Sequence, residues 1–156
     1  DLPKCDRIEV QIGGDETPIE YYRGQGGDPP NASRYRVEVG SSGDFSVPEK
    51  GVLCVSTGDL DHAEYFKDKR NSGNPSDPAK IYKWSMPAWF DKCVKQHQTY
   101  QKNYSSGKPE DCKRNLGGLA PKIVDPNQPG DSYEFNPPWD KAFEKYAIKG
   151  SGKICQ

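Results

Sequence analysis

Hydrophobic residues are scarce in this chain of 156 residues: they make up 32% of it, and it has a single methionine. No apolar run approaches the roughly 18 residues that cross a bilayer, so the sequence predicts no membrane segment. Because glycine occurs 16 times and proline 14 times, we expect short helices and strands joined by many turns. Three Trp, nine Tyr and five Phe must then supply most of the core of a single domain, residues 1–156.

An excess of charge of either sign is also missing. The chain has 22 basic and 23 acidic residues, and no five consecutive residues share a charge. Binding to a phosphate backbone normally needs a basic stripe, so this balance disfavours nucleic acid as a partner. A small anionic ligand held by one or two arginines remains compatible with it.

The five cysteines form no Cys-x-x-Cys pair and no Cys/His cluster with zinc spacing, so the sequence predicts no metal site. Disulfides fit better. A Cys5–Cys155 bond would join the two ends, and a Cys93–Cys112 bond would close a polar loop. Cys54, which lies in an apolar run, is then predicted to be a buried, unreactive thiol. Disulfides belong to oxidising compartments, and we therefore expect a secreted protein.

The middle of the chain changes its hydrophobic period. Val52–Val55 is a continuous apolar run, which predicts a core strand buried on both faces. A helical spacing follows over 59–70, with Asp59 as its N-cap. Between them, Ser56-Thr57-Gly58 would form the turn at the carboxyl end of the strand. Small hydroxyls and backbone N–H groups at such a turn can contact a ligand or simply satisfy the turn itself.

Short alternating segments dominate the rest of the chain. They predict strands over 8–12, 19–23, 34–40, 45–48, 80–84, 122–124 and 133–135, with an edge segment over 151–155. Two more helices are predicted over 85–97 and 136–146. We therefore expect an α+β fold in which mixed, mainly antiparallel strands are flanked by about three short helices.

Three positions carry candidate chemistry. Arg23 ends an early strand and precedes a glycine-rich loop, Ser56 and Thr57 end the core strand, and Glu134 lies on a late strand after a turn-rich loop. In this order they resemble the ADP-ribosyltransferase toxins of the Arg-Ser-Glu class. The resemblance implies split β-sheets of the ADP-ribosyltransferase type, with NAD as the substrate.

The resemblance also implies roles. Arg23 would hold a phosphate or ribose of NAD, Ser56 and Thr57 would brace the cleft, and Glu134 would sit at the nicotinamide ribose. Breaking the nicotinamide–ribose bond builds positive charge on the sugar, which a carboxylate stabilises. Catalysis is thus expected from Glu134, Arg23 and Ser56. The other residues expected to bind NAD are Gly24, Thr57, Tyr22 and Tyr65.

The chain departs from the family pattern at two positions. Gly58 replaces the third small hydroxyl, and Ser132 replaces the residue that usually selects an arginine on a protein target. The acceptor of ADP-ribose therefore stays open: it is an unknown macromolecule or water. An immunity or inhibitor protein is a further expected partner of a toxin of this kind.

Two other functions are compatible with the sequence. One is a small secreted ribonuclease that uses Glu64, His62 and either Arg70 or Arg36, with the histidine as general acid. The other is a secreted binding or effector domain without catalysis, in which aromatic residues contact a partner and the disulfides only stabilise.

Overall fold

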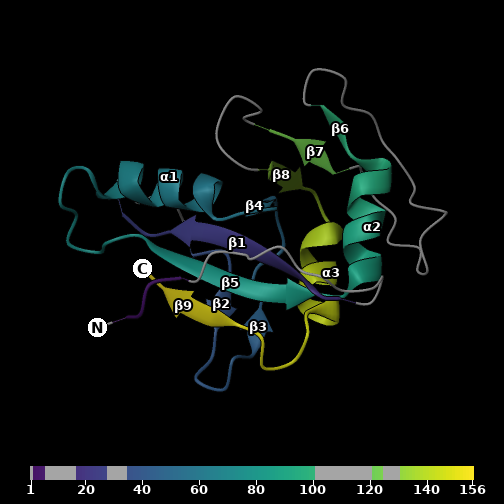
Figure 1. Ribbon diagram of the computed structural model, residues 1–156, viewed down its shortest axis with the longest axis horizontal. Coiled ribbons are helices and arrows are strands. Elements are labelled where there is room, and N and C mark those ends of the chain that lie inside the picture. The colour runs from purple at the N-terminus through teal and green to yellow at the C-terminus, as the bar shows by residue number, and fades with distance from the viewer. Residues whose placement is uncertain (1, 6–16, 28–34, 101–120, 125–130) are drawn as a thin grey trace.

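The strands of this protein form one large sheet and one small hairpin (Figure 1). The computed structural model describes residues 2–5, 17–27, 35–100, 121–124 and 131–156. Within them the sheet order is β6-β7-β8-β4-β1-β5-β9, and every neighbouring pair is antiparallel except β6–β7. The expected α+β class, mainly antiparallel with three helices, is confirmed.

The elements follow one another along the chain with short strands and short helices. The strands are β1 (Ile19–Gln25), β2 (Glu38–Val39), β3 (Phe45–Ser46), β4 (Leu53–Thr57), β5 (Lys80–Met86), β6 (Thr99–Tyr100), β7 (Lys122–Ile123), β8 (Asp131–Phe135) and β9 (Lys153–Cys155). The helices are α1 (Asp61–Asn71), α2 (Ala88–His97) and α3 (Trp139–Tyr146). The strand predicted over 8–12 lies outside the described residues.

The large sheet has two halves that meet over a short pairing. Strand β1 pairs with β5 along its whole length, and β4 does the same with β8. Strands β1 and β4, in contrast, pair only at Tyr21–Thr57 and Tyr22–Ser56. The halves β6-β7-β8-β4 and β1-β5-β9 are therefore joined at the centre of the sheet and part just beyond Tyr22.

One face of the sheet carries most of the hydrophobic core, and we call it the core face. It presents Tyr21, Leu53, Trp84 and Phe135, all fully buried, to the helices α2 and α3. Phe143 of α3 lies at the centre of this packing, with ring centroids 5.2 Å from Tyr21 and 4.8 Å from Phe135. Aromatic residues thus supply the core, as the low hydrophobic content predicts.

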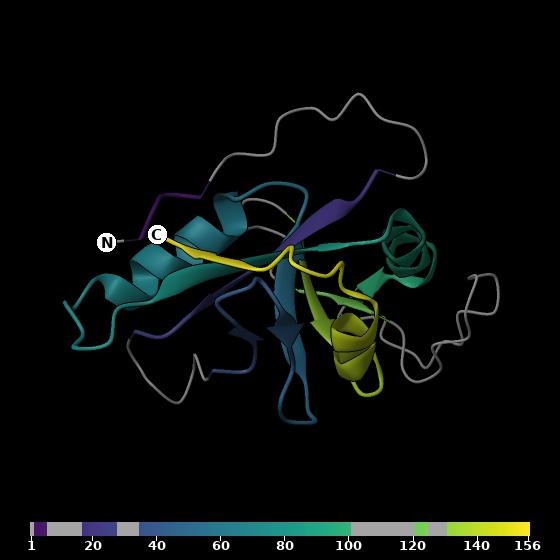
Figure 2. The same ribbon diagram turned by 90° about the horizontal axis from the view of Figure 1, so that it is seen from below.

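The opposite face, which we call the polar face, carries Tyr22, Ser56, Lys83, Lys122 and Glu134. These residues share a face because residues directly opposite each other in a ladder point the same way, and the register pairs Tyr22 with Ser56 and Lys83. It likewise pairs Glu134 with Lys122. Helix α1 covers only part of this face, and Figure 2 shows it well apart from α2 and α3.

Helix α1 rests on the β1-β5-β9 half of the polar face. Its Ala63 and the preceding Leu60 form a second, smaller buried cluster with Tyr22, Ile81 and Cys155. The helix begins at Asp61, two residues later than predicted, and its N-cap is Leu60 rather than the predicted Asp59; the Asp59 carboxylate accepts the N–H of Asp61 at 2.7 Å. No helix in the described parts of the chain combines the length and the apolarity needed to cross a bilayer.

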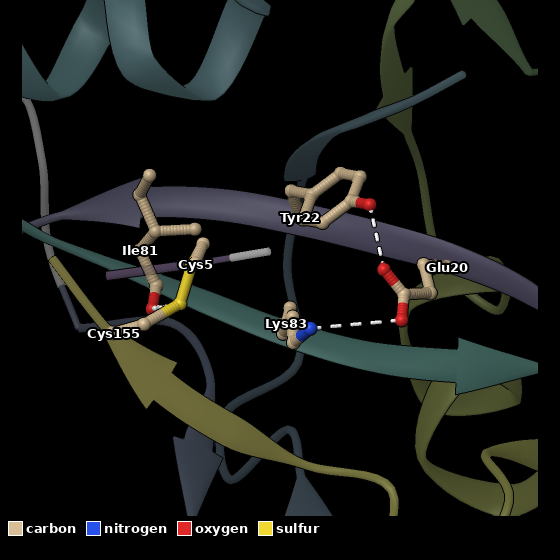
Figure 3. The surroundings of a disulfide bond; sticks show 6 residues. All are labelled: Cys5, Glu20, Tyr22, Ile81, Lys83 and Cys155. Carbon is tan, nitrogen blue, oxygen red and sulfur yellow. Dashed lines mark hydrogen bonds and ion pairs between the residues drawn. A yellow bond between two sulfur atoms is a disulfide. The ribbon is translucent and has the colours of Figure 1, made fainter. Parts of the chain in front are cut away.

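The two ends of the described chain are held together, as predicted. Cys5 and Cys155 form a disulfide with their Cα atoms 5.2 Å apart, close to Ile81 of β5 (Figure 3). Nearby, the N–H of Gln156 donates to the carbonyl oxygen of Pro3 at 2.8 Å. Cys93 is also disulfide-bonded, and its predicted partner Cys112 lies outside the described residues.

Helix α3 begins later than predicted. The sequence indicates a start at Asn136 with prolines in the first turn, whereas the helix begins at Trp139, after both prolines. The Pro137–Pro138 peptide bond is cis, and the N–H of Trp139 donates to the carbonyl oxygen of Asn136 at 2.9 Å. The prolines therefore shape the turn that leads into the helix.

Candidate functional site

Ser56 and Glu134 lie on the same face of the sheet, in neighbouring strands. The register sets Glu134 of β8 directly opposite Cys54 of β4, and Ser132 directly opposite Ser56. Residues two positions apart on a strand share a face, so Ser56 and Glu134 are diagonal neighbours on the polar face. The structure brings together these two of the three predicted catalytic residues.

Glu134 is held in place by a lysine on the next strand. Lys122 of β7 lies opposite it in the ladder, with Nζ 3.3 Å from Oε1 of Glu134. The two side chains are 16% and 25% exposed, so solvent screens this ion pair only partly. Sequence reasoning did not single out Lys122. Its strand was predicted, but only the register shows that it faces Glu134.

Cys54 is exposed, and the prediction of a buried thiol is wrong. Leu53 and Val55 point into the core face, and because strand residues alternate, Cys54 points to the polar face. Val52, just before the strand, is also exposed. The apolar run therefore does not mark a strand buried on both faces: its β4 portion is buried on one face and open at Cys54 on the other.

Arg23 leaves β1 on the core-face side and reaches the point where β1 and β4 part. Its Nε donates to Oε1 of Gln25 at 3.0 Å, and its Nη1 donates to the carbonyl oxygen of Cys54 at 2.9 Å. The guanidinium thus contacts the backbone of the residue that faces Glu134. The two side chains, however, leave the sheet from opposite faces, so the structure does not bring Arg23 and Glu134 onto one surface.

The surroundings of Arg23 lower the pKa of its guanidinium. Burial lowers the pKa of its guanidinium to about 10; nearby Cys54 opposes this change, and Arg36 and Arg70 add to it. The group still carries its positive charge at neutral pH. A half-buried cation therefore lies next to the exposed Cys54, with Glu134 across β4 from that residue.

Tyr22 belongs to a buried polar network on the polar face (Figure 3). Its hydroxyl donates to Oε2 of Glu20 at 2.7 Å, and Oε1 of Glu20 lies 3.6 Å from Nζ of Lys83. Burial, followed by this hydrogen bond, raises the pKa of Tyr22 well above its usual value. Thr57 pairs with Tyr21 and therefore lies on the core face, on the other side of β4 from Ser56; its hydroxyl donates to the carbonyl oxygen of Glu20 at 2.6 Å. Tyr22 and Thr57 therefore stabilise the interior.

The two remaining predicted NAD contacts lie along α1. Gly24 allows the helix to approach the sheet: a Cβ there would lie 3.3 Å from the carbonyl oxygen of Ala63, tighter than most contacts. Tyr65 is 38% exposed on the helix surface, where its ring packs against Phe66. Of the aromatic residues predicted at the NAD site, Tyr65 has a ring that a ligand can reach.

The residues proposed for a ribonuclease are not gathered into one site. His62 is buried in α1 with its ring 4.8 Å from that of Phe66. Glu64 follows two positions later, so it points to a different side of the helix. The guanidinium of Arg36 packs against Gly51, and Arg70 follows His62 by eight residues on α1, about 12 Å further along the helix axis. In the described part of the chain, no three His, Cys, Asp or Glu residues cluster in a way that could hold a metal ion.

Comparisons with family models, with curated proteins and with solved structures found no match to this chain. Any functional assignment therefore depends on the arrangement of side chains described above.

Proposed function

We propose that this protein cleaves NAD at the nicotinamide–ribose bond and transfers ADP-ribose to a macromolecular acceptor or to water. The observation that carries the proposal is the pairing of Glu134 with Cys54 and Ser132 with Ser56, which puts a half-buried carboxylate and two hydroxyls on one side of the sheet. The two-part sheet, joined only over Tyr21 and Tyr22, supports an ADP-ribosyltransferase-like fold as part of the same proposal.

Glu134 is the proposed catalytic residue. As the bond to nicotinamide breaks, the ribose gains positive charge, and a carboxylate beside it lowers the energy of that state while accepting a hydrogen bond from a ribose hydroxyl. Lys122 acts as a positioning residue, because its ion pair at 3.3 Å restricts the carboxylate to one region of the polar face. Ser56 is the hydroxyl proposed to brace the same region.

Arg23 is proposed to bind the diphosphate. Its guanidinium is already ordered by Gln25 and by the carbonyl oxygen of Cys54, so binding an anion requires little further loss of side-chain entropy. A planar guanidinium also matches the geometry of phosphate oxygens. Because Arg23 leaves β1 on the other side, this role requires the dinucleotide to pass the point where β1 and β4 part.

Nicotinamide release from NAD tests the proposal directly. We expect turnover by the purified, disulfide-bonded chain and a loss of about 10²–10³ in rate for Glu134→Gln, the magnitude of removing one group that stabilises transition-state charge. Glu49→Gln is the matched control, because Glu49 is an exposed glutamate in the loop between β3 and β4 and belongs to no strand of the sheet. The proposal fails if the wild type releases no nicotinamide, or if Glu134→Gln and Glu49→Gln are equally active.

The same assay separates the other functions. If the protein cleaves RNA and leaves NAD intact, it is a ribonuclease. If it acts on neither substrate, the remaining function is that of a binding domain. We also propose that the protein is secreted, which fits the Cys5–Cys155 disulfide. An inhibitor protein is part of the same proposal, as a binding partner. Mass spectrometry of proteins modified with ADP-ribose would identify the acceptor.

A further inference from the structure

A groove of about 500 Å³ lies between the β2–β3 hairpin and the edge formed by β5 and β9. Tyr82 of β5 contributes to its wall, and the register places Tyr82 opposite Arg23, on the core-face side of the sheet. The groove is therefore on the other side of the sheet from Glu134. Nothing in the proposed NAD chemistry uses it.

Two tyrosines form an aromatic wall of this groove. The rings of Tyr35 and Tyr82 are arranged edge to face, with centroids 6.4 Å apart. Tyr35 is 48% exposed, yet its ring is fixed, because its hydroxyl donates to Oδ2 of Asp77 at 2.6 Å. That hydrogen bond, assisted by partial burial, raises the pKa of Tyr35 to about 12, so the ring is uncharged at neutral pH.

Among the described residues, the charged side chains that line the groove are all acidic. Glu38 and Asp44 are both exposed there, and this part of the chain contributes neither lysine nor arginine to the lining. The remaining wall is aliphatic, from Val39 and Ile154 in particular. Aromatic faces attract cations, carboxylates pair with them, and an aliphatic wall accommodates the apolar stem of a long basic side chain.

We propose that this groove binds an arginine side chain presented by a partner polypeptide. Charge complementarity selects a basic occupant, and the tyrosine pair favours the planar guanidinium over the compact ammonium of lysine. The groove thus provides a docking site for a partner protein on the opposite side of the sheet from Glu134 and Ser56. This inference is independent of the proposed NAD cleavage.

Binding of a short oligo-arginine peptide tests it, with the matching oligo-citrulline peptide as the neutral isostere. We would follow backbone amide shifts by NMR at low salt and expect them to map to Val37–Gly40, Asp44–Ser46, Tyr82 and Ile154. Glu38→Gln with Asp44→Asn should weaken binding about tenfold, and Tyr35→Leu about threefold, since an exposed cation–π contact is worth less than two carboxylates.

The matched control is Glu49→Gln with Asp68→Asn, which removes the same charge from two exposed positions outside the groove. It should bind the arginine peptide within about twofold of the wild type. Equal weakening by both double variants, equal binding of the citrulline peptide, or shifts that map elsewhere would each overturn the proposal. Circular dichroism of every variant establishes that the fold is intact, and none of these outcomes depends on NAD.

Discussion

Two consecutive tyrosines in β1 point to opposite faces of the sheet and have different surroundings. Tyr21 enters the aromatic core and donates a 2.8 Å hydrogen bond to buried Asp91 of α2. Tyr22 points the other way, into a network with Glu20 and Lys83. The core face is built from rings packed against two helices, whereas the polar face carries paired charges under a single helix. The comparison teaches that strand alternation puts Glu134 and Ser56 on the polar face, away from the main aromatic core, whereas Arg23 leaves β1 on the core-face side.

The largest expected difference in the free energy of unfolding is between substitutions at two neighbouring residues of β4 that point to opposite faces. Leu53→Ala should lower the free energy of unfolding by about 2–5 kcal/mol, because it leaves a cavity in the core face. Cys54→Ala should stay within about 0.5 kcal/mol, because the thiol is exposed. Chemical denaturation measures both. Equal effects would show that the two faces do not differ in this way.

Removing the disulfide should affect the half of the sheet that contains β9. We expect Cys5→Ser with Cys155→Ser to lower the free energy of unfolding by about 2–4 kcal/mol, because the bond closes a long loop in the unfolded chain. Urea denaturation of the double variant against the wild type gives this difference. An unchanged midpoint would mean that the backbone hydrogen bonds of Gln156 with Pro3 and Cys5 hold the ends without it.

Alkaline pH should destabilise both faces. Burial, as the largest cause, raises the pKa of Tyr21, Tyr22 and Tyr133 above the usual 10.0. The folded chain then keeps protons that the unfolded chain releases, so stability present below about pH 10 is lost as the pH rises further. The hydrogen bond to Asp77 also raises the pKa of Tyr35, to about 12. Arg23, whose pKa is lowered to about 10, opposes this loss between about pH 10 and 12.5 but is one group against four.

Denaturant midpoints measured across this range would show the decline. Tyr22→Phe should flatten it, because the variant lacks one of the raised groups. A midpoint that stays constant to about pH 11 would contradict the expectation.

The smallest expected effect lies on the polar face. Lys122→Gln should change the free energy of unfolding by at most about 1 kcal/mol, since a partly exposed ion pair contributes little. Thermal and chemical denaturation both measure it. A loss as large as that of Leu53→Ala would make the Lys122–Glu134 pair a structural element of the sheet, and the two faces would then share the task of holding the fold together.

Much of the fold could be predicted because alternation and helical spacing are local signals. The strands around Tyr21 and Tyr82 and the helix containing Phe90 lie where the sequence indicates them. The core strand is shifted: β4 leaves out Val52 and includes Ser56 and Thr57, which were predicted to form the turn after it. Helix starts were less accurate: α1 begins at Asp61 and α3 at Trp139, because tertiary packing and the adjacent prolines decide where the first helical residue falls.

The candidate site could be predicted only in part. Which strands become neighbours depends on contacts distant in the chain, so the pairing of Glu134 with Cys54 and with Lys122 had no local signal. Strand alternation alone predicts that Arg23 points to the same face of the sheet as Tyr21 and not to the face of Tyr22. Only the register of the strands shows whether Glu134 also points to that face. The exposure of Cys54 was missed for the same reason: an apolar run does not reveal that one of its faces lacks a covering helix.

The junction of the first and last described segments has a consequence for protein engineering. Because Cys5 and Cys155 are bonded and the backbones of Pro3 and Gln156 touch, the two segments already lie side by side at one margin of β9. A short linker between them would close the polypeptide into a ring without separating any pair of strands, and new ends could then be opened at the exposed Ser41–Ser42 turn of the β2–β3 hairpin. The chain can thus be circularly permuted while the pairing of its β-strands is kept.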